Sequence, residues 1–352
     1  MRLMLRPMRM DAHETANEAK DANGTRPAKK VVVATHGYCL DGLCSAAMFT
    51  RLLRHVEAGA LRFDYAACTY GPGQNGVDPK VLSGDVNAVL DYRFSIAPQL
   101  TWYFDHHVTG FASPAERDTA LGGAAVAPDG RPQVFWQPTY GSCAKLIADI
   151  ARDRFGVDMS PLAELIGWAD IIDTARFPSA EAATTADEPV LQLAAVIEHH
   201  GDGPFLNALV PQLLERPLAE IARSAEVQAQ WGPILAARDA FVRRVERAAE
   251  VRGPVVLVDL TDAPLEVAAK FVTYARYPQC TYSVMLTRNK QHFKLSVGYN
   301  PWSGVPRGHD IAAICRRYDG GGHPAVGACS FPLSAEARAR EAARAVTEEL
   351  AR

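Results

Sequence analysis

The chain has 352 residues, enough for two domains of ordinary size, and its composition of 48% hydrophobic and 22% charged residues is typical of a soluble globular protein. No apolar run reaches the roughly 18 residues that a membrane-spanning helix needs, which excludes an integral membrane protein of that kind. The net charge of −3 supplies no overall positive field, so a polyanionic substrate would have to be held by local cations or by bound metal.

The amino-terminal part of the chain predicts the first unit of an α/β sheet. Residues 1–28 lack the apolar core of a signal peptide, and we expect a disordered leader, with Met10 as an alternative start. Residues 31–34 form an apolar, β-branched run that predicts a buried parallel strand, and residues 42–56 show helical periodicity. A strand, a glycine-containing loop and a helix in this order are typical of an α/β fold.

Two further apolar runs each end at an acidic residue. Residues 88–90 lead into Asp91, and residues 100–104 lead into Asp105. In open α/β sheets, ligand sites form beyond the carboxyl ends of the strands. We therefore expect Asp91, Asp105 and the loop after the first strand to share one site.

The remainder of the chain predicts helices followed by a second sheet. Helices are expected at residues 140–155 and 161–172, and a long helix is expected from residue 212 to 252. Further predictions are a strand at 255–260, a hairpin of 282–286 and 292–297 joined at 288–290, and a terminal helix at 334–352. The predicted limits are a leader (1–28), a first domain (29–205), a helical linker (206–252) and a second domain (253–352).

The loop after the first strand carries candidate metal ligands. It reads His36-Gly37-Tyr38-Cys39-Leu40-Asp41-Gly42. A His and an Asp five residues apart can reach one metal centre or two adjacent ions, and the glycines let the backbone turn tightly enough to aim both inward. Taken alone, Cys39 would more often be a small buried side chain than a ligand.

Histidine pairs occur twice in the chain, and their settings differ. His106 and His107 follow Asp105 at the end of a predicted strand, where one imidazole can bind metal while the other faces substrate. His199 and His200 follow no such strand, and we expect them to end a helix.

Two later motifs add carboxylates and glycines. Asp170 and Asp173 are three residues apart, so on a helix they share a face, and the apolar residues around them favour burial with a partner. Gly320, Gly321 and Gly322 precede His323. Consecutive glycines suit a backbone that approaches a phosphate closely, where His323 can donate a hydrogen bond.

In this order, the motifs resemble those of the DHH phosphoesterase superfamily. Asp105-His106-His107 matches the motif that names the superfamily, and Gly320-Gly321-Gly322-His323 matches the glycine-rich motif of its DHHA1-type second domain. The resemblance covers about residues 30–335. It implies an α/β fold, with a parallel-sheet DHH catalytic domain joined by a helical linker to a smaller α/β DHHA1-type domain.

The resemblance also implies roles for individual residues around two divalent ions, usually manganese. His36 would bind the first ion, Asp41 and His106 the second, and Asp91 would bridge them. The last carboxylate is Asp173 or Asp170. Asp173 is preferred because residues 173–177 resemble the D-T-x-x-F form of that motif.

The same resemblance implies how substrate is held. His107 would face the substrate phosphate. His107 and Asp105 are the two residues to which the resemblance gives a catalytic role. The second domain would bind the phosphate or the nucleotide through one cation, three glycines and one imidazole: Arg316, Gly320, Gly321, Gly322 and His323.

One departure from the superfamily pattern concerns the metal. Cys39 stands where the first motif usually has an additional Asp, which gives the form H-G-x-C-x-D-G of a less characterised branch. A thiolate ligand at Cys39 would favour Fe²⁺ or Zn²⁺ over Mn²⁺ at the first position. Without it, that ion would bind more weakly or the site would hold a single metal.

The function implied is two-metal hydrolysis of phosphodiester bonds in short oligonucleotides or dinucleotides. One alternative is a phosphoanhydride hydrolase of the pyrophosphatase or exopolyphosphatase type, against which the glycine-histidine motif weighs. Another is a non-catalytic nucleotide-binding relative, against which the retained ligands argue. The expected partner is a phosphorylated small molecule or short nucleic acid rather than a membrane, and a homodimer is left open. Seven scattered cysteines without a C-x-x-C pair favour a reducing, cytoplasmic location.

Overall fold

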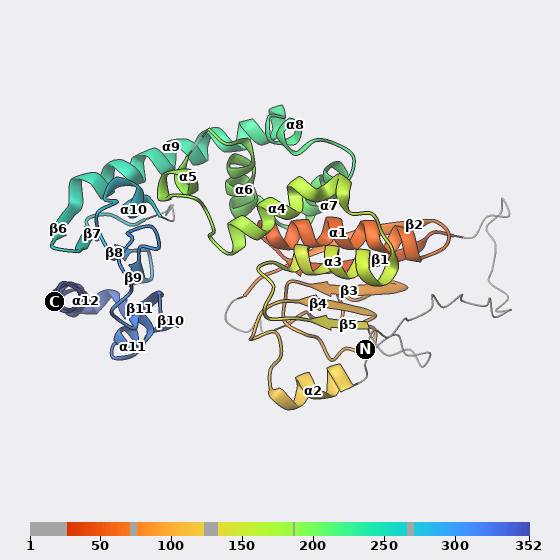
Figure 1. The fold of residues 1–352 in the computed structure, drawn as a ribbon, viewed down its shortest axis with the longest axis horizontal. Helices are drawn as coiled ribbons and strands as arrows, with labels where there is room; N and C mark the ends of the chain where they lie inside the picture. The colour runs from red at the N-terminus through yellow and green to blue at the C-terminus, as the bar shows by residue number, and fades with distance from the viewer. Residues whose placement is uncertain (1–26, 71–75, 123–132, 186, 266–270) are drawn as a thin grey trace, which may run out of the picture.

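The computed structural model describes residues 27–70, 76–122, 133–185, 187–265 and 271–352. These residues form two lobes, each built on its own β-sheet, with a helical segment between them (Figure 1). Within the described ranges, no helix combines the length and the apolar character needed to cross a membrane. Residues 1–26 of the predicted leader lie outside the described residues.

The first lobe contains the predicted parallel sheet. Its five strands are all parallel and follow the order β2-β1-β3-β4-β5. They are β1 (Lys29–His36), β2 (Leu61–Cys68), β3 (Val86–Leu90), β4 (Trp102–Asp105) and β5 (Gln133–Trp136). Every residue of β3 and residues 31–35 of β1 are buried, which explains why these runs are continuously apolar rather than alternating.

Helices cover one face of this sheet and enclose the largest core. They are α1 (Leu40–Val56), α3 (Cys143–Phe155), α4 (Ala163–Asp173), which follows the short 3-10 turn η1 (Ser160–Leu162), α6 (Pro189–His200) and α7 (Gly203–Leu213). The opposite face packs on loop side chains that include Leu82 and Tyr92. Helix α2 (Pro114–Gly122) buries none of its side chains. His199 and His200 end α6, as the sequence predicts.

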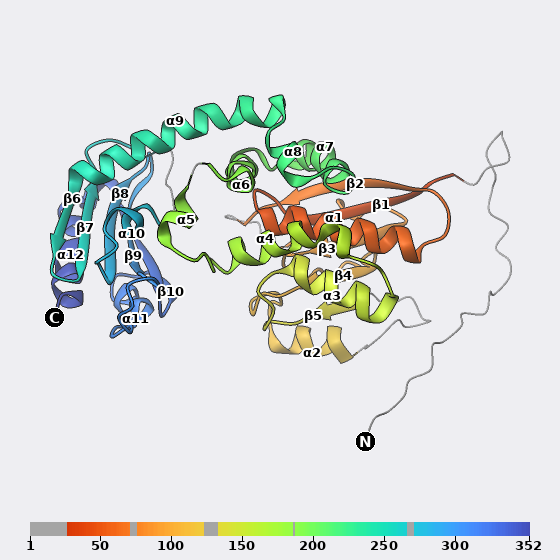
Figure 2. The same ribbon diagram turned by 45° about the horizontal axis from the view of Figure 1, so that its top comes forward.

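The predicted single helix from residue 212 to 252 is wrong in its extent. The segment contains the end of α7, then α8 (Leu218–Ala222), α9 (Ala225–Ala248) and the strand β6 (Ala249–Arg252). A new helix starts at Ser224 because its side chain accepts a hydrogen bond from the Val227 backbone N–H, as an N-cap does. Helix α9 runs from the first lobe to the second (Figures 1 and 2).

The second lobe is a mixed six-stranded sheet in the order β10-β11-β9-β8-β7-β6, in which only β7 and β8 are parallel. Besides β6, its strands are β7 (Val255–Leu260), β8 (Tyr282–Arg288), β9 (His292–Tyr299), β10 (Gly321–His323) and β11 (Val326–Pro332). Its helices are α10 (Val272–Arg276), α11 (Ile311–Arg316) and α12 (Glu336–Leu350), with the 3-10 turn η2 (Leu333–Ala335) before α12. The predicted β8–β9 hairpin and terminal helix are confirmed.

The two lobes meet through a small group of aromatic residues. The Nε1–H of Trp302, in the second lobe, donates to the backbone carbonyl of Phe177 at 2.8 Å. The ring of Phe271 lies between them, 5.3 Å from Trp302 and 6.5 Å from Phe177. Because Phe177 is only four residues beyond Asp173, the second lobe contacts the segment that follows a predicted metal ligand.

Candidate metal centre

The carboxyl ends of the parallel strands bring most of the predicted ligands together. His36 ends β1, Asp91 directly follows β3 and Asp105 ends β4. Because β1 and β4 both flank β3, side chains at the ends of these three strands meet at one edge of the sheet. The start of α1 and the end of α4 add Asp41 and Asp173 at the same edge.

Three overlapping groups of side chains at this edge could hold metal ions. Within each group the ligand atoms lie within 4.8 Å of one another. The groups are His36, Cys39 and Asp91; Asp91, His106 and His107; and Asp41, His106 and Asp173. Since Asp91 and His106 each belong to two groups, the seven residues form one continuous set, called here the ligand cluster.

His106 lies at the centre of the ligand cluster. Its Nδ1 is 3.1 Å from the backbone carbonyl of Tyr140, which can only accept, so Nδ1 carries a hydrogen. Nε2 then faces the carboxylates, 3.5 Å from Asp91 Oδ1, 3.5 Å from Asp173 Oδ2 and 3.7 Å from Asp41 Oδ2. Burial alone would lower the pKa of His106, but the carboxylates of Asp91 and Asp41 raise it to about 10.

Asp41 is held by the start of helix α3. Its Oδ2 accepts from the Cys143 backbone N–H at 2.7 Å, and its Oδ1 accepts from Ala144 at 2.9 Å. The first N–H groups of a helix lack partners within the helix and favour a negative charge. Even so, burial and the charges of Asp91 and Asp173 raise the pKa of Asp41 well above its usual value.

Asp91 adopts a backbone conformation that is uncommon for residues other than glycine. Its φ is 52°, and Tyr38 and Ala175, which belong to two other loops of the site, have φ values of 57° and 53°. Such conformations are concentrated at functional sites because the surrounding structure must enforce them. Burial would raise the pKa of the Asp91 carboxyl, but the nearby imidazoles of His106 and His36 outweigh that effect and lower it.

Two atoms of the ligand cluster show that its residues fit a divalent cation. Asp91 Oδ1 and His106 Nε2 are buried and 3.5 Å apart, and among the described residues neither atom makes a hydrogen bond of good geometry. A buried polar atom without a partner costs about 1–3 kcal/mol, so such atoms are rare in native proteins. Carboxylate oxygens and imidazole nitrogens are ligands that Mn²⁺ and similar ions accept. Coordination would satisfy both atoms.

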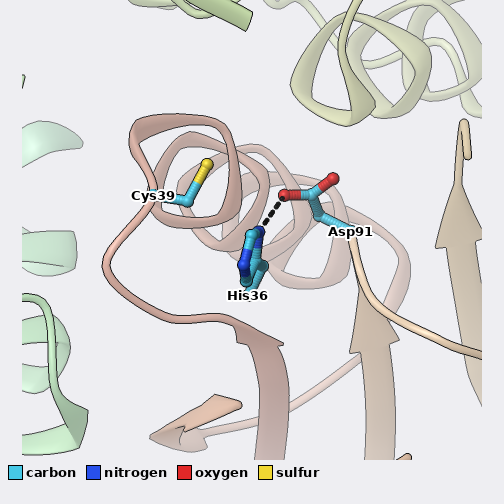
Figure 3. Close-up of side chains that lie close together, drawn as sticks. All are labelled: His36, Cys39 and Asp91. Carbon is cyan, nitrogen blue, oxygen red and sulfur yellow. Dashed lines mark ion pairs between the residues drawn. The ribbon is translucent and has the colours of Figure 1, made fainter. Parts of the chain in front are cut away.

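Cys39 lies inside the ligand cluster rather than in the apolar core. Figure 3 shows its side chain beside those of His36 and Asp91, with His36 Nδ1 3.6 Å from Asp91 Oδ2. Burial, followed by the charges of Asp91 and Asp41, raises the pKa of the Cys39 thiol well above its usual value. Cys39 is therefore a neutral thiol in the metal-free cluster.

The sequence leaves open whether Asp173 or Asp170 is the last metal ligand, and the structure places these two carboxylates in different surroundings. Asp173, at the end of α4, reaches His106 in the ligand cluster. Asp170, one turn earlier, lies against Gly141 and 3.8 Å from the guanidinium of Arg176. Asp170 belongs to none of the three ligand groups among the described residues.

Asp105 is fully buried and faces His107 rather than the open side of the site. Its Oδ1 lies 2.8 Å from His107 Nδ1, and its Oδ2 accepts from the Tyr103 hydroxyl at 3.0 Å. This hydrogen bond with Asp105 raises the pKa of His107. The arrangement fixes the His107 ring, whose side chain remains 38% exposed.

Comparison with known proteins gives the fold. No family model matches the sequence, and no curated protein is significantly similar to it in sequence. The structure of PggH, a pGpG-specific phosphodiesterase from Vibrio cholerae, superposes with a TM-score of 0.64 at 19% identity, covering 92% of this chain and 99% of that one. A DHH domain from a protein described as a member of the s1p family of ribosomal proteins gives 0.58 at 14%, covering 92% and 87%. The chain has the DHH-superfamily fold.

The manganese-bound exonuclease RecJ also has a similar structure, with a TM-score of 0.50 at 16% identity, covering 93% of this chain and 92% of that one. The similarity extends over both lobes, so the mixed sheet is the DHHA1-like second domain of the DHH fold. The predicted fold class is therefore confirmed.

In this DHHA1-like domain the glycine-rich motif is a strand rather than an open loop. Gly321–His323 form β10, paired antiparallel with β11. At Gly322, whose φ is 147°, an added Cβ would lie 2.2 Å from the carbonyl oxygen of Val326, so the close strand approach requires glycine. At Gly321 an added Cβ would meet nothing. Two of the glycines at 320–322 thus have a packing role that the sequence does not reveal.

The predicted phosphate-binding residues do not belong to the ligand cluster. Arg316, at the end of α11, and His323 are exposed, and neither side chain has a hydrogen-bond or ion-pair partner among the described residues. The two views agree that β10 lies on the side of the second domain turned toward the first (Figures 1 and 2). Their predicted role in substrate binding stays a prediction.

Sequence reasoning missed several groups that support the ligand cluster. The Tyr140 carbonyl and the backbone N–H groups of Cys143 and Ala144 carry no side-chain signal, although Ser142 is a recognisable N-cap for α3. Tyr70 lies next to His36 with a ring-centroid distance of 5.4 Å, and no motif indicates it.

Proposed function

We propose that this protein is a metal-dependent phosphodiesterase that acts on short oligonucleotides or dinucleotides. The observation that carries the proposal is the ligand cluster, with the buried Asp91 Oδ1 and His106 Nε2 at its centre, neither of which makes a hydrogen bond with the described residues. Its position beyond the carboxyl ends of the strands is where α/β sheets bind ligands. The DHH fold, shared with a phosphodiesterase and a manganese-bound exonuclease, supports the same reading.

The ligand cluster offers donors for two divalent ions. His36, Cys39 and Asp91 would hold one, and a second set would hold the other: Asp41, His106 and Asp173, together with Asp91. Five of these six side chains offer oxygen or nitrogen, which favours Mn²⁺, while the Cys39 sulfur would favour Fe²⁺ or Zn²⁺ at the first position. Divalent ions bound here would supply activation of water and stabilisation of negative charge on the phosphoryl group.

The remaining residues would position substrate and protons. The half-exposed His107 would donate a hydrogen bond to the substrate phosphate, with its ring orientation fixed by the buried Asp105. Arg316 and His323, both without partners among the described residues, would contact the far end of the substrate from the second domain. The net charge of −3 favours a small substrate held by local contacts over a long polyanion.

Among short substrates, a 5′-phosphorylated dinucleotide such as pGpG is the one we propose. Support comes from PggH, whose structure is similar along 99% of its own length. A substrate of two nucleotides would also fit contacts from the two domains better than a long strand would.

The test combines metal analysis with hydrolysis by the same preparation. Purified protein should contain up to two equivalents of divalent metal, and it should hydrolyse pGpG in the presence of Mn²⁺. The variant His106→Ala should lose both metal and turnover, whereas His199→Ala, a histidine outside the cluster, should keep both. Hydrolysis of pyrophosphate but not of pGpG would replace the proposal by a phosphoanhydride hydrolase. Binding of pGpG without turnover would replace it by a nucleotide-binding protein.

A further inference from the structure

A half-exposed tyrosine lies next to the ligand cluster, and the proposed chemistry does not use it. Tyr70 is two residues beyond the end of β2, and β2 is paired with β1 so that Cys68 is opposite His36. Tyr70 therefore stands at the same sheet edge as the cluster. Its ring centroid is 5.4 Å from that of His36, in an edge-to-face arrangement with an interplanar angle of 67°.

The Tyr70 ring is supported by a second tyrosine ring. It packs on the Tyr92 ring with a centroid distance of 4.5 Å and an interplanar angle of 34°. Tyr92 is fully buried, and its hydroxyl donates to the Thr69 carbonyl at 2.7 Å, so the support is rigid. Tyr70 nevertheless remains 49% exposed. Single exposed apolar residues are common, but this ring packs on a buried aromatic side chain beside a cluster of metal ligands.

The exposed part of the Tyr70 side chain is a neutral aromatic surface at the rim of the ligand cluster. Such a surface favours a flat aromatic partner, because stacking of a base on an aromatic ring contributes about 1–3 kcal/mol.

We propose that Tyr70 is a stacking platform for a nucleobase of the substrate, so the site selects phosphodiesters that carry bases over inorganic phosphates. This inference rests on the proposed phosphodiesterase function and adds how the substrate class is chosen. A base lies one sugar away from its phosphate, which suits a ring that neighbours a metal-ligating histidine. Stacking on an aromatic side chain tolerates any base, because every base has a π-face. Tyr70 would therefore contribute affinity without strict base identity.

The test compares the hydrolysis of two substrates, one that carries bases and one that lacks them. The probes are pGpG and an abasic dinucleotide with the same 5′-phosphate and the same phosphodiester bond. For each protein, the ratio of kcat/KM for pGpG to kcat/KM for the abasic analogue is measured. Tyr70→Leu, which keeps apolar volume but removes the ring, should lower this ratio about tenfold, mainly through KM, and Tyr70→Phe should preserve it.

Tyr38 supplies a matched comparison. It is also exposed, at 41%, and lies in the loop after His36, but the described residues give it no ring partner. Tyr38→Leu should change the ratio less than twofold. An equal fall in Tyr38→Leu and Tyr70→Leu, or an unchanged ratio in Tyr70→Leu, would overturn the stacking role.

Failure of this inference can be told apart from failure of the proposed function. If the unsubstituted protein hydrolyses both dinucleotides with similar kcat/KM, it is a phosphodiesterase that does not use the bases, and only the stacking role is lost. If it hydrolyses neither, the proposed function fails and the inference fails with it. Metal content is measured for each variant, so that a loss caused by disturbance of His36 is recognised.

Discussion

Removing the Tyr103 hydroxyl should destabilise the first domain more than removing that of another buried tyrosine. Tyr103 is fully buried, and its hydroxyl donates to the Oδ2 of the equally buried Asp105 at 3.0 Å. Hydrogen bonds to charged groups contribute about 1.5–3 kcal/mol, and those between neutral groups about 0.5–1.5 kcal/mol. Tyr92, also buried, donates to a neutral carbonyl and is the matched control. We expect Tyr103→Phe to cost about 2 kcal/mol and Tyr92→Phe about 1 kcal/mol.

Urea unfolding of the metal-free protein, followed by tryptophan fluorescence, measures this difference. With an m value of about 2 kcal/mol/M, a loss of about 2 kcal/mol lowers the midpoint by about 1 M. Because Asp105 orients His107, Tyr103→Phe should also reduce kcat on pGpG, while Tyr92→Phe should not. Equal midpoint shifts in the two variants would show that the Asp105 charge is not stabilised through Tyr103, and the reasoning would be refuted.

Three further outcomes are expected. Asp173→Ala should lower Mn²⁺ affinity at least tenfold, whereas Asp170→Ala should leave it within a factor of two; calorimetric titration would show the opposite order if the other carboxylate were the ligand. Because its neighbours raise the pKa of His106 to about 10, a bound ion must displace a proton at neutral pH. Metal affinity should then rise with pH and protons should be released, which titrations in buffers of different ionisation enthalpy detect; no dependence on buffer would contradict this. Trp302→Phe removes the hydrogen bond to Phe177, which holds the two domains together, and should raise KM for pGpG about fivefold with little change in kcat. A fall in kcat alone would argue against this role of Trp302.

Much of the first domain could be predicted because local signals and tertiary packing agree there. The apolar runs that end at Asp91 and Asp105 are strands buried on both faces, and such strands are continuously apolar. The order of the motifs then indicates which strand ends share a site. By contrast, β5 is a short edge strand, Gln133–Trp136, whose four residues give no clear period.

The parts that could not be predicted depend on contacts between distant segments. Asp170 and Asp173 are both on one helix, and only the contact of Asp170 with Gly141 and Arg176 shows which of them leaves the cluster. The role of Gly322 depends on how closely β10 approaches β11. The support of Tyr70 by Tyr92 likewise joins two loops, 22 residues apart, that no motif connects.

Strand pairing between distant residues also explains why the single helix predicted at residues 212–252 is wrong in its extent. Ala, Arg and Glu favour helix throughout residues 212–252, so propensity predicts one helix. The final residues, Ala249–Arg252, instead form a strand that pairs with β7. This pairing gives hydrogen-bond partners to the backbone N–H and C=O groups at the edge of the second sheet. Tertiary pairing overrides helix propensity there.

Anomalous X-ray scattering at the manganese edge, from crystals grown with Mn²⁺, tests most directly whether the ligand cluster binds metal. We predict anomalous density next to Asp91 Oδ1 and His106 Nε2, the two buried atoms that make no hydrogen bond with the described residues. Anomalous density elsewhere, or none at this edge of the sheet in crystals of a protein that hydrolyses pGpG, would contradict it.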